Sequence, residues 1–177
     1  MCITRRTLVV LAGLPGAGKS TALGKLRTDS GVLRLDSDQV RSRLRAALPA
    51  VPYRYYRPLV HALHRGRIAL ACVLARGPVV AHEPATRAGT RALLLLLARL
   101  SGRKAVLLWL HADAGEALRG QRSRGRLIRS RSFERHARRA GRVHRELLAG
   151  NPPSGWSAVR QLTREEVAAG LRVEVGT

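Results

Sequence analysis

Cysteine and long apolar runs are both scarce in this sequence. Cys2 and Cys72 are its two cysteines. They are too few for a disulfide framework, and we predict a reducing, cytoplasmic environment. The leucine run at 93–97 is bounded by Arg91 and Arg99, and no apolar run reaches the roughly 18 residues that a membrane-spanning helix requires. The sequence therefore predicts neither a disulfide-stabilised protein nor a membrane partner.

Acidic residues and lysine are also rare. The 177 residues include 33 Lys and Arg against 11 Asp and Glu, which gives a formal net charge of +22. Lysine occurs only at Lys19, Lys25 and Lys104, so arginine supplies nearly all of the positive charge. Such a charge favours a polyanionic partner such as nucleic acid. A GC-rich coding sequence also produces abundant Arg, Ala, Gly and Leu with little Lys, so the charge is either functional or compositional.

The strongest motif is the stretch Gly13-Leu14-Pro15-Gly16-Ala17-Gly18-Lys19-Ser20. It has the form G-x-x-x-x-G-K-S, follows the apolar run 7–12 and precedes a helix-like segment, which predicts a phosphate-binding loop. Glycines let successive backbone N–H groups turn around a phosphate, and the helix N-terminus adds a favourable dipole. We therefore predict that ATP binds to the loop residues Gly13, Pro15, Gly16, Ala17, Gly18, Lys19, Ser20 and Thr21.

Two side chains of this loop and one strand-end acid have expected roles in catalysis. Lys19 is expected to bridge the β- and γ-phosphates, and the Ser20 hydroxyl to bind Mg²⁺. A short second strand, predicted over 32–35, leads to Asp36. The carboxyl ends of parallel strands lie at the edge where α/β proteins bind ligands. We therefore predict that Asp36 also binds Mg²⁺.

Strand-like and helix-like segments alternate along the whole chain. Strands are predicted over 7–12, 32–35, 79–81, 105–110 and 157–162, and helices over 21–28, 39–48, 58–76, 89–100, 114–120, 133–148 and 165–171. This alternation predicts a three-layer α/β fold, the P-loop NTPase fold, in which helices cover both faces of a five-stranded parallel sheet. The length fits one domain, which we assign to residues 1–177.

The pattern Asp36-x-Asp38-x-x-Arg41 follows the second strand. A kinase needs a carboxylate that accepts the proton of an acceptor hydroxyl held in line with the γ-phosphate. We predict that Asp38 is this catalytic base and contacts the acceptor. Arg41, one helical turn further on, is predicted to bind an anionic group of the acceptor or to steady the Asp38 carboxylate. The alternative is structural: Asp38 caps a helix and forms a surface ion pair with Arg41.

A run of arginines occupies residues 122–131. A segment that brings guanidinium groups over the transferred phosphate would stabilise its charge and exclude water. We predict an arginine-rich lid over residues 121–132, in which Arg124 is catalytic and Arg122 or Arg126 helps to bind the nucleotide. The alternative is a solvated basic loop.

The tyrosines of the chain gather in one segment. All three lie in Tyr53-Arg54-Tyr55-Tyr56-Arg57. Tyr53, Tyr56 and Arg57 would supply stacking faces and a charge for binding the acceptor. The alternative is that these aromatic side chains pack a loop onto the core.

His82-Glu83-Pro84 follows the third predicted strand, where P-loop proteins often place an acid that supports Mg²⁺. Glu83 would replace that acid through water and face the acceptor, or Asp36 would act alone. Arg164, after the fifth strand, is expected to stack on adenine. His61 and His64 have no third ligand nearby, so no zinc site is predicted.

Four motifs together resemble those of one group of kinases. They are GLPGAGKST at 13–21, LDSDQVR at 35–41, the strand-and-arginine stretch 79–91 and RSRGR at 122–126. The chain resembles small P-loop kinases related to the kinase domain of phage polynucleotide kinase and, more loosely, gluconate kinase and zeta toxins. It is also similar to arginine-rich actinobacterial proteins described as ATP-binding, of the AAA domain type.

The resemblance implies a fold and several residue roles. The implied strand order is 2-3-1-4-5, as in nucleoside kinases. Asp38 would be the general base, Arg41 would contact a phosphate of the acceptor, and Arg124 would be the lid arginine. In related chains the third strand usually ends in Asp, often within Asp-Ala-Thr, and here it ends in His82-Glu83-Pro84.

The expected function is ATP- and Mg²⁺-dependent transfer of the γ-phosphoryl group to an acceptor hydroxyl. A polynucleotide 5′-hydroxyl and a small metabolite both stay open as acceptors. The alternative is an ATP-binding regulatory module that hydrolyses ATP slowly or not at all. His82 in the place of the family's acid favours this alternative.

Overall fold

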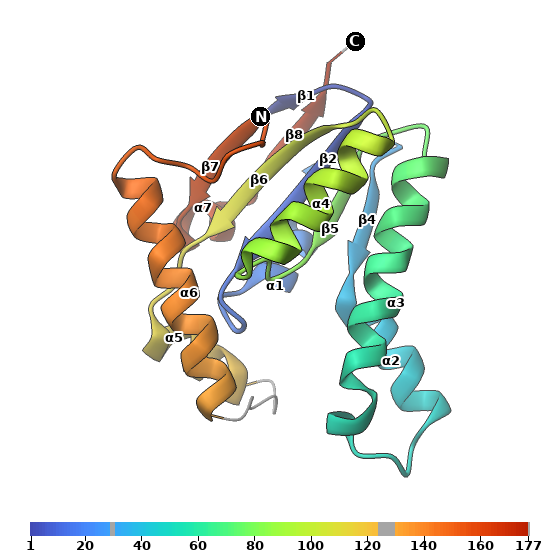
Figure 1. The fold of residues 1–177 in the computed structure, drawn as a ribbon, viewed down its shortest axis with the longest axis vertical. Helices are drawn as coiled ribbons and strands as arrows, with labels where there is room; N and C mark the ends of the chain where they lie inside the picture. The colour runs from blue at the N-terminus through green and yellow to red at the C-terminus, as the bar shows by residue number, and fades with distance from the viewer. Residues whose placement is uncertain (29–30, 124–129, 177) are drawn as a thin grey trace.

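The computed structural model describes residues 1–28, 31–123 and 130–176. Strands and helices alternate through this part of the chain (Figure 1). The strands are β1 (Cys2–Ile3), β2 (Thr7–Gly13), β3 (Arg27–Thr28), β4 (Leu33–Asp36), β5 (Val79–His82), β6 (Lys104–Leu110), β7 (Ala158–Leu162) and β8 (Arg172–Val175). The helices are α1 (Lys19–Lys25), α2 (Ser37–Ala47), α3 (Tyr53–Leu74), α4 (Ala88–Leu100), α5 (Ala114–Arg122), α6 (Ser130–Leu148) and α7 (Arg164–Ala169).

Five of the strands form one parallel sheet in the order β4-β5-β2-β6-β7. Counted along the chain, these five strands have the order 2-3-1-4-5, which confirms the predicted topology. The central strand is β2, and all seven of its residues are buried. Its leucine and β-branched side chains suit a strand that packs against helices on both faces.

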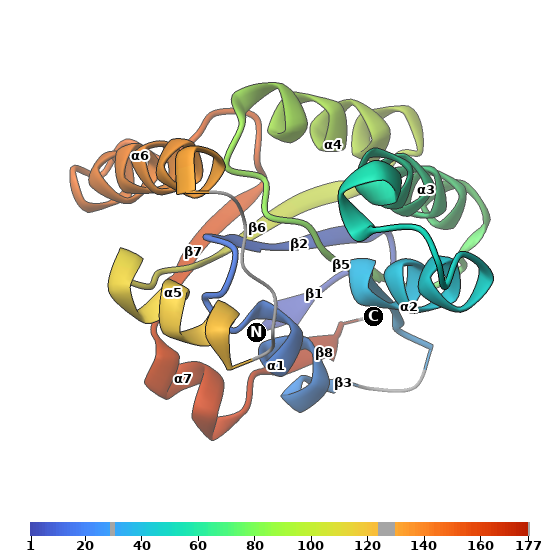
Figure 2. The same cartoon turned by 90° about the horizontal axis from the view of Figure 1, so that it is seen from below.

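Helices cover both faces of this sheet, which confirms the predicted three-layer α/β fold (Figure 2). α3, α4 and α6 lie on one face, and α1 and α7 lie on the other. In α4 the buried residues are Thr90, Leu94 and Ala98, spaced by about one helical turn, so one stripe of the helix packs on the sheet. None of the helices in the described ranges has the length and apolarity needed to cross a membrane.

Helix α3 begins earlier than the sequence predicts. The predicted start was Pro58, because proline suits the first turn of a helix, but α3 begins at Tyr53 and Pro58 lies inside it. Tyr56 and Val60 pack with Val40 of α2 in a small apolar cluster separate from the main core. Burial of these side chains stabilises the additional turn, which proline propensity alone does not reveal.

Residues near both ends of the chain form a second parallel sheet that the sequence did not predict. Its order is β1-β8-β3, with Cys2 opposite Glu174 and Arg27 opposite Arg172. The Met1 ammonium donates to the Arg172 carbonyl oxygen at 2.8 Å. Strands as short as β1 and β3 show no readable alternation of apolar and polar residues, so local patterns do not identify them.

Arg103 is a buried arginine with a structural role. It is 6% exposed, and its guanidinium donates to the carbonyl oxygens of Cys72 at 2.7 Å, Gly77 at 2.9 Å and Ala75. These carbonyls lie at the end of α3 and just beyond it, where no further helical turn supplies N–H donors. Arg103 therefore closes the C-terminus of α3 and fixes it to the start of β6.

Arg103→Leu is expected to lower the free energy of unfolding by about 3 kcal/mol, because three carbonyl oxygens lose a charged donor. Lys104→Leu, at the neighbouring exposed position, is the matched control and should change the free energy by less than about 0.5 kcal/mol. Urea denaturation followed by tryptophan fluorescence measures both values. Equal stability of the two variants would contradict the proposed role of Arg103.

Candidate active site

The phosphate loop begins at the last residue of β2 and contains three glycines with positive φ angles. Gly13, Gly16 and Gly18 have φ angles of 138°, 94° and 100°, a region that favours glycine. A Cβ atom at Gly13 would lie 2.3 Å from the Leu110 carbonyl oxygen, and one at Gly16 would lie 2.0 Å from that of Ala117. The backbones of β6 and α5 therefore approach this loop too closely for a side chain at either position.

Helix α5 contacts the phosphate loop directly, which sequence analysis missed. Gln121 Nε2 donates to the Pro15 carbonyl oxygen at 3.0 Å. A Cβ atom at Gly120 would lie 2.3 Å from the carbonyl oxygen of Gly16, so both backbones need glycine at the contact. A glycine inside a helix was the available signal, since such a residue usually has a packing reason.

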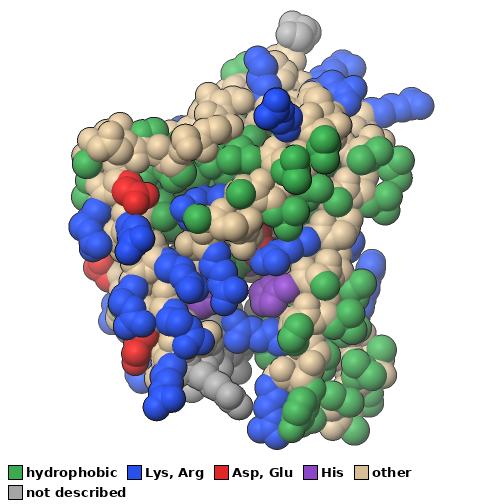
Figure 3. Space-filling model, viewed as in Figure 1, with side chains coloured by type: hydrophobic (Ala, Val, Ile, Leu, Met, Phe, Trp, Pro, Cys, Tyr) green, Lys and Arg blue, Asp and Glu red, His purple; other side chains and the backbone are tan. Residues whose placement is uncertain are grey.

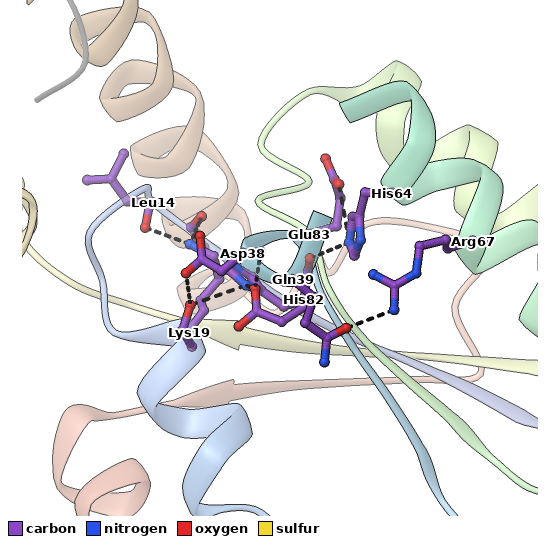
Figure 4. A network of polar contacts seen from close by, with 11 residues as sticks. Leu14, Lys19, Asp38, Gln39, His64, Arg67, His82 and Glu83 are labelled. Atoms are coloured by element: carbon purple, nitrogen blue, oxygen red, sulfur yellow. Dashed lines mark hydrogen bonds and ion pairs between the residues drawn. The ribbon is translucent and has the colours of Figure 1, made fainter. Parts of the chain in front are cut away.

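Lys19 is buried inside the loop that it belongs to. It is 3% exposed, and Nζ donates to the carbonyl oxygens of Gly13 at 2.9 Å and Leu14 at 2.8 Å (Figure 4). A buried ammonium group requires such acceptors. These bonds fix a positive charge within the loop, where it would attract a phosphate.

Ser20 connects the phosphate loop to carboxylates at the end of β4. Its Oγ donates to Asp38 Oδ2 at 3.3 Å and lies 3.5 Å from His82 Nδ1. Asp36 Oδ1 accepts from His82 Nδ1 at 2.7 Å and from the Asp38 backbone N–H at 2.9 Å. The structure thus brings Ser20 together with Asp36, Asp38 and His82, the residues that the sequence placed at the ends of two neighbouring strands.

The register of the sheet explains this arrangement. Asp36 on β4 is the parallel partner of His82 on β5, and His82 is the partner of Leu11 on β2, two residues before the phosphate loop begins. Asp36 also accepts the N–H bond that caps α2. The alternative in which Asp38 caps this helix is therefore wrong.

Asp36 remains ionised in this environment. Burial by itself would raise its pKa, but the hydrogen bond and charge of His82, with the Asp38 N–H and the Ser20 hydroxyl, lower the pKa well below its usual range. Because an ionised carboxylate only accepts hydrogen bonds, His82 donates through Nδ1–H. A full negative charge therefore lies at the edge of the sheet, next to the phosphate loop.

The oxygen atoms of Ser20, Asp36 and Asp38 make a donor set that fits Mg²⁺. This ion prefers oxygen ligands and usually combines one or two carboxylates with phosphate oxygens and several waters. Within the described ranges, no group of three or more His, Cys, Asp or Glu side chains is arranged for a metal ion.

Glu83 and His64 form a buried layer against α3. Glu83 is 2% exposed, its Oε1 accepts from Arg65 Nη2 at 3.3 Å, and its Oε2 lies 4.0 Å from His64 Nε2. His64 Nε2 donates to the His82 carbonyl oxygen at 2.8 Å (Figure 4). Burial lowers the pKa of His64, although Glu83 acts to raise it. The predicted contact of Glu83 with the acceptor stays a prediction.

Arg41, Tyr53 and Tyr56 stack between α2 and α3. The Arg41 guanidinium carbon lies 4.3 Å from the centroid of the Tyr53 ring. The rings of Tyr53 and Tyr56 meet edge to face with centroids 5.3 Å apart. Tyr56 is 7% exposed and packs with Val40 and Val60. This tyrosine therefore has the packing role that was the alternative to binding the acceptor. The predicted contacts of Arg41 and Tyr53 with an acceptor stay predictions.

The predicted lid is described only at its two ends. Arg122 is the last residue of α5, and the predicted lid residues Arg124 and Arg126 lie outside the described residues. Arg164 lies at the start of α7, and its Nε atom is 3.6 Å from Glu116 Oε2. Its predicted stacking on adenine stays a prediction.

His136 of α6 is a candidate site residue that sequence analysis missed. Its Nδ1 lies 2.8 Å from Thr86 Oγ1, so it links α6 to the segment that follows β5. Burial, followed by the charges of three arginines and Lys19, lowers the pKa of His136 to about 4, and the ring is neutral at pH 7. No local sequence pattern marks His136, because its neighbours come from separate segments.

Comparisons with known proteins agree with this architecture. A family model described as an AAA domain matches residues 8–148, whereas a search of curated proteins gives no match. The fold is similar to that of a Deinococcus radiodurans tunicamycin resistance protein (15% identity over 93% of this chain and 95% of that chain, TM-score 0.54). It is also similar to a Sinorhizobium meliloti gluconokinase (16% identity over 96% of this chain and 89% of that chain, TM-score 0.54). A third similar structure is an Acinetobacter baumannii shikimate kinase (17% identity over 92% of this chain and 89% of that chain, TM-score 0.53).

These likenesses, at low identity, show the fold, which is that of P-loop kinases. The match of the family model is more specific, because it runs from β2 to the end of α6 and includes the phosphate loop. The chain therefore belongs to the AAA domain family that this model describes.

Proposed function

We propose that this protein is an ATP- and Mg²⁺-dependent kinase that transfers the γ-phosphoryl group to an acceptor hydroxyl. The observation that carries the proposal is the 3.3 Å hydrogen bond from Ser20 Oγ to Asp38 Oδ2. This bond joins the phosphate loop to a carboxylate that follows a neighbouring strand, so nucleotide and acceptor would meet there. The names of two proteins with similar folds, a gluconokinase and a shikimate kinase, support a phosphotransferase.

In the proposed reaction, loop residues 13–21 bind the phosphates of ATP, and Lys19 contacts the β- and γ-phosphates. Ser20 and Asp36 would hold Mg²⁺, which when bound offsets the negative charge of the phosphate oxygens. Asp38 orients the acceptor hydroxyl and takes its proton while the acceptor oxygen bonds to the γ-phosphorus. The bond from the γ-phosphorus to the β–γ bridging oxygen breaks, and ADP leaves.

Arginines complete the proposed site from two sides. Arg41 and Tyr53, which are stacked on each other, would face the acceptor from the side of α2 and α3. Arg124, with Arg122 and Arg126, would close over the nucleotide and stabilise the charge on the transferred group.

A second candidate function is an ATP-binding regulatory module without transfer activity. His82 favours it, because a histidine bound to Asp36 stands where related kinases carry an acid. The two candidates are separated by incubating the protein with labelled ATP and a panel of acceptors: 5′-hydroxyl oligonucleotides, nucleosides, sugars and aminoglycosides. A labelled acceptor supports the kinase. ATP binding without any labelled acceptor supports the module.

Asp38→Asn is expected to lower the turnover number about 10²-fold or more, because the amide no longer accepts the proton of the acceptor. Binding of ATP, measured by calorimetry, should change little. Glu165→Gln removes a carboxylate from an exposed position of α7 and serves as the matched control. If Asp38→Asn and Glu165→Gln turn over the labelled acceptor equally fast, Asp38 is not the base.

A further inference from the structure

Three arginines from separate segments converge on His136. Arg57 belongs to α3, Arg87 to the segment between β5 and α4, and Arg139 to α6, and each is close enough to disfavour a proton on the His136 ring. Lys19 of the phosphate loop acts on the same ring. Lysine and arginine side chains gather with histidines in the hollow between α6 and α3 (Figure 3). We call Arg57, Arg87 and Arg139 the basic cluster.

The arginines of the basic cluster make no ion pair with an acid in the part of the chain that the structure describes, residues 1–28, 31–123 and 130–176. Glu83 lies close enough to His61 to affect its pKa, as do Arg57 and Arg87. Glu83 is, however, buried and paired with Arg65. Like charges held together repel one another, and an anion bound among them would relieve this repulsion.

The segment that carries Arg87 is held in a fixed conformation. Ala85 has a φ angle of 48°, a left-handed conformation that residues with a Cβ atom rarely adopt. Arg91 Nη1 donates to the carbonyl oxygens of Ala85 at 3.0 Å and Thr86 at 3.2 Å. The Thr86 hydroxyl lies 2.8 Å from His136 Nδ1. These bonds maintain the conformation and keep Arg87 beside α6.

We propose that the basic cluster binds a phosphate group that the acceptor already carries, so that the substrate is a phosphorylated compound with a free hydroxyl. This inference rests on the proposed function, because it places an acceptor next to Lys19. Guanidinium groups suit the task, since their planar forks match phosphate oxygens. A sugar phosphate and the 5′-hydroxyl end of an oligonucleotide both have this chemistry.

A competing role for the basic cluster is contact with the γ-phosphate of ATP. In that case, substitution of an arginine would weaken binding of an ATP analogue and slow the transfer to every acceptor. Contact with a phosphate of the acceptor instead predicts weaker binding of phosphorylated acceptors alone. Binding measurements with matched probes therefore separate the two roles.

The test compares Arg139→Gln with Arg138→Gln, the same change at the neighbouring, exposed residue of α6. Calorimetry on the full chain measures binding of ribose 5-phosphate against ribose. It also measures binding of a 5′-hydroxyl decanucleotide against its uncharged methylphosphonate analogue. Arg139→Gln is expected to weaken binding of at least one phosphate-bearing probe about tenfold, and Arg138→Gln by less than about twofold.

The two probe pairs identify the source of the phosphate. Dependence of ribose 5-phosphate binding on Arg139 indicates a small acceptor. If only the binding of the decanucleotide depends on Arg139, the acceptor is a nucleic acid. In that case the slope of log affinity against log salt concentration should be smaller in magnitude by about one for Arg139→Gln than for the unsubstituted protein.

The proposal would be overturned if Arg139→Gln and Arg138→Gln weakened probe binding equally. It would also be overturned if Arg139→Gln weakened the binding of charged and uncharged probes equally. An Arg139→Gln effect confined to a non-hydrolysable ATP analogue would overturn it as well. If phosphate-dependent binding is found but no acceptor is phosphorylated, the kinase proposal fails while the binding site stands.

A second inference comes from the outer face of α3. Every exposed residue of this helix from 58 to 74 is apolar or glycine, in a chain with a net charge of +22. Leu70 is 60% exposed and Val73 is 69% exposed, and several hydrophobic side chains lie along this side of the molecule (Figure 3). An extended apolar surface of this kind marks a contact site. The α3 stripe consists of the exposed residues Leu59, Ala62, Leu63, Gly66, Leu70 and Val73 together with the partly buried Ala69.

The α3 stripe is complementary to itself about Gly66. When two copies of α3 pack antiparallel with a two-fold axis at Gly66, residues equally far from it on opposite sides face each other. The facing pairs are Leu63 with Ala69, Leu70 with Ala62, and Leu59 with Val73. Large side chains thus meet small ones near the axis, and no atom lies within 4 Å of a Cβ position at Gly66, so a partner helix can approach closely.

We infer that the α3 stripe is the interface of a two-fold homodimer. A second copy of the chain supplies the complementary surface in the required order, as an isologous interface demands. Two chains of high positive charge repel each other, but the stripe itself is uncharged, and salt screens charges beyond about 8 Å at physiological ionic strength. The dimer should therefore become more stable as the salt concentration rises.

Sedimentation velocity tests both the dimer and its register. Leu59→Glu and Val73→Arg alter exposed side chains, and each variant alone should be monomeric. Mixed together they should form a heterodimer, because the introduced carboxylate and guanidinium face each other. Leu148→Glu, at an exposed site on α6, should leave the dimer intact. A wild-type monomer at every protein and salt concentration would overturn the dimer, and no association in the mixture would overturn the antiparallel register.

Discussion

The parallel register of β4, β5 and β2 is the constraint on which the rest of the site depends. It places Asp36 beside His82 and His82 beside the strand that enters the phosphate loop. A shift of one residue would turn every side chain of a strand to the opposite face. The hydrogen bonds among Ser20, Asp38 and His82 therefore exist only in this register. The buried ring of His64 reinforces it by holding the His82 carbonyl group.

The sequence was sufficient to predict the phosphate loop, the three-layer fold and the meeting of Ser20 with the carboxylates after β4. These features depend on local patterns and on the rule that parallel strands end at one edge of a sheet, and the strand order followed from the resemblance. The contact between Gly120 and Gly16 joins residues far apart in the chain, and a glycine inside a helix was its only local sign. The arginines around His136 are brought together by tertiary structure alone, and in an arginine-rich sequence they look like any others.

The arginine excess is divided among distinct physical tasks. Arg103 closes the end of α3, Arg91 holds the left-handed segment after β5, and Arg65 pairs with the buried Glu83. These uses contribute to folding and require no polyanion. On α3 the partly buried positions carry Arg57, Arg65 and Arg67, whereas none of the exposed positions over 58–74 carries a charge. A bias in the coding sequence raises the number of arginines, but it does not separate them onto one side of a helix.

Histidine at the end of β5 changes the distribution of charge where ATP would bind. An acid at this position would add a second negative charge beside Asp36, and each carboxylate would raise the pKa of the other. His82 instead donates to Asp36 and helps to lower its pKa, so the last residue of β5 adds no carboxylate to those of Asp36 and Asp38. The cations fixed nearby are Lys19 inside the loop and the arginines around His136. The site thus combines the two carboxylates that follow β4 with fixed positive charge on several sides, an arrangement that suits two phosphorylated ligands held close together.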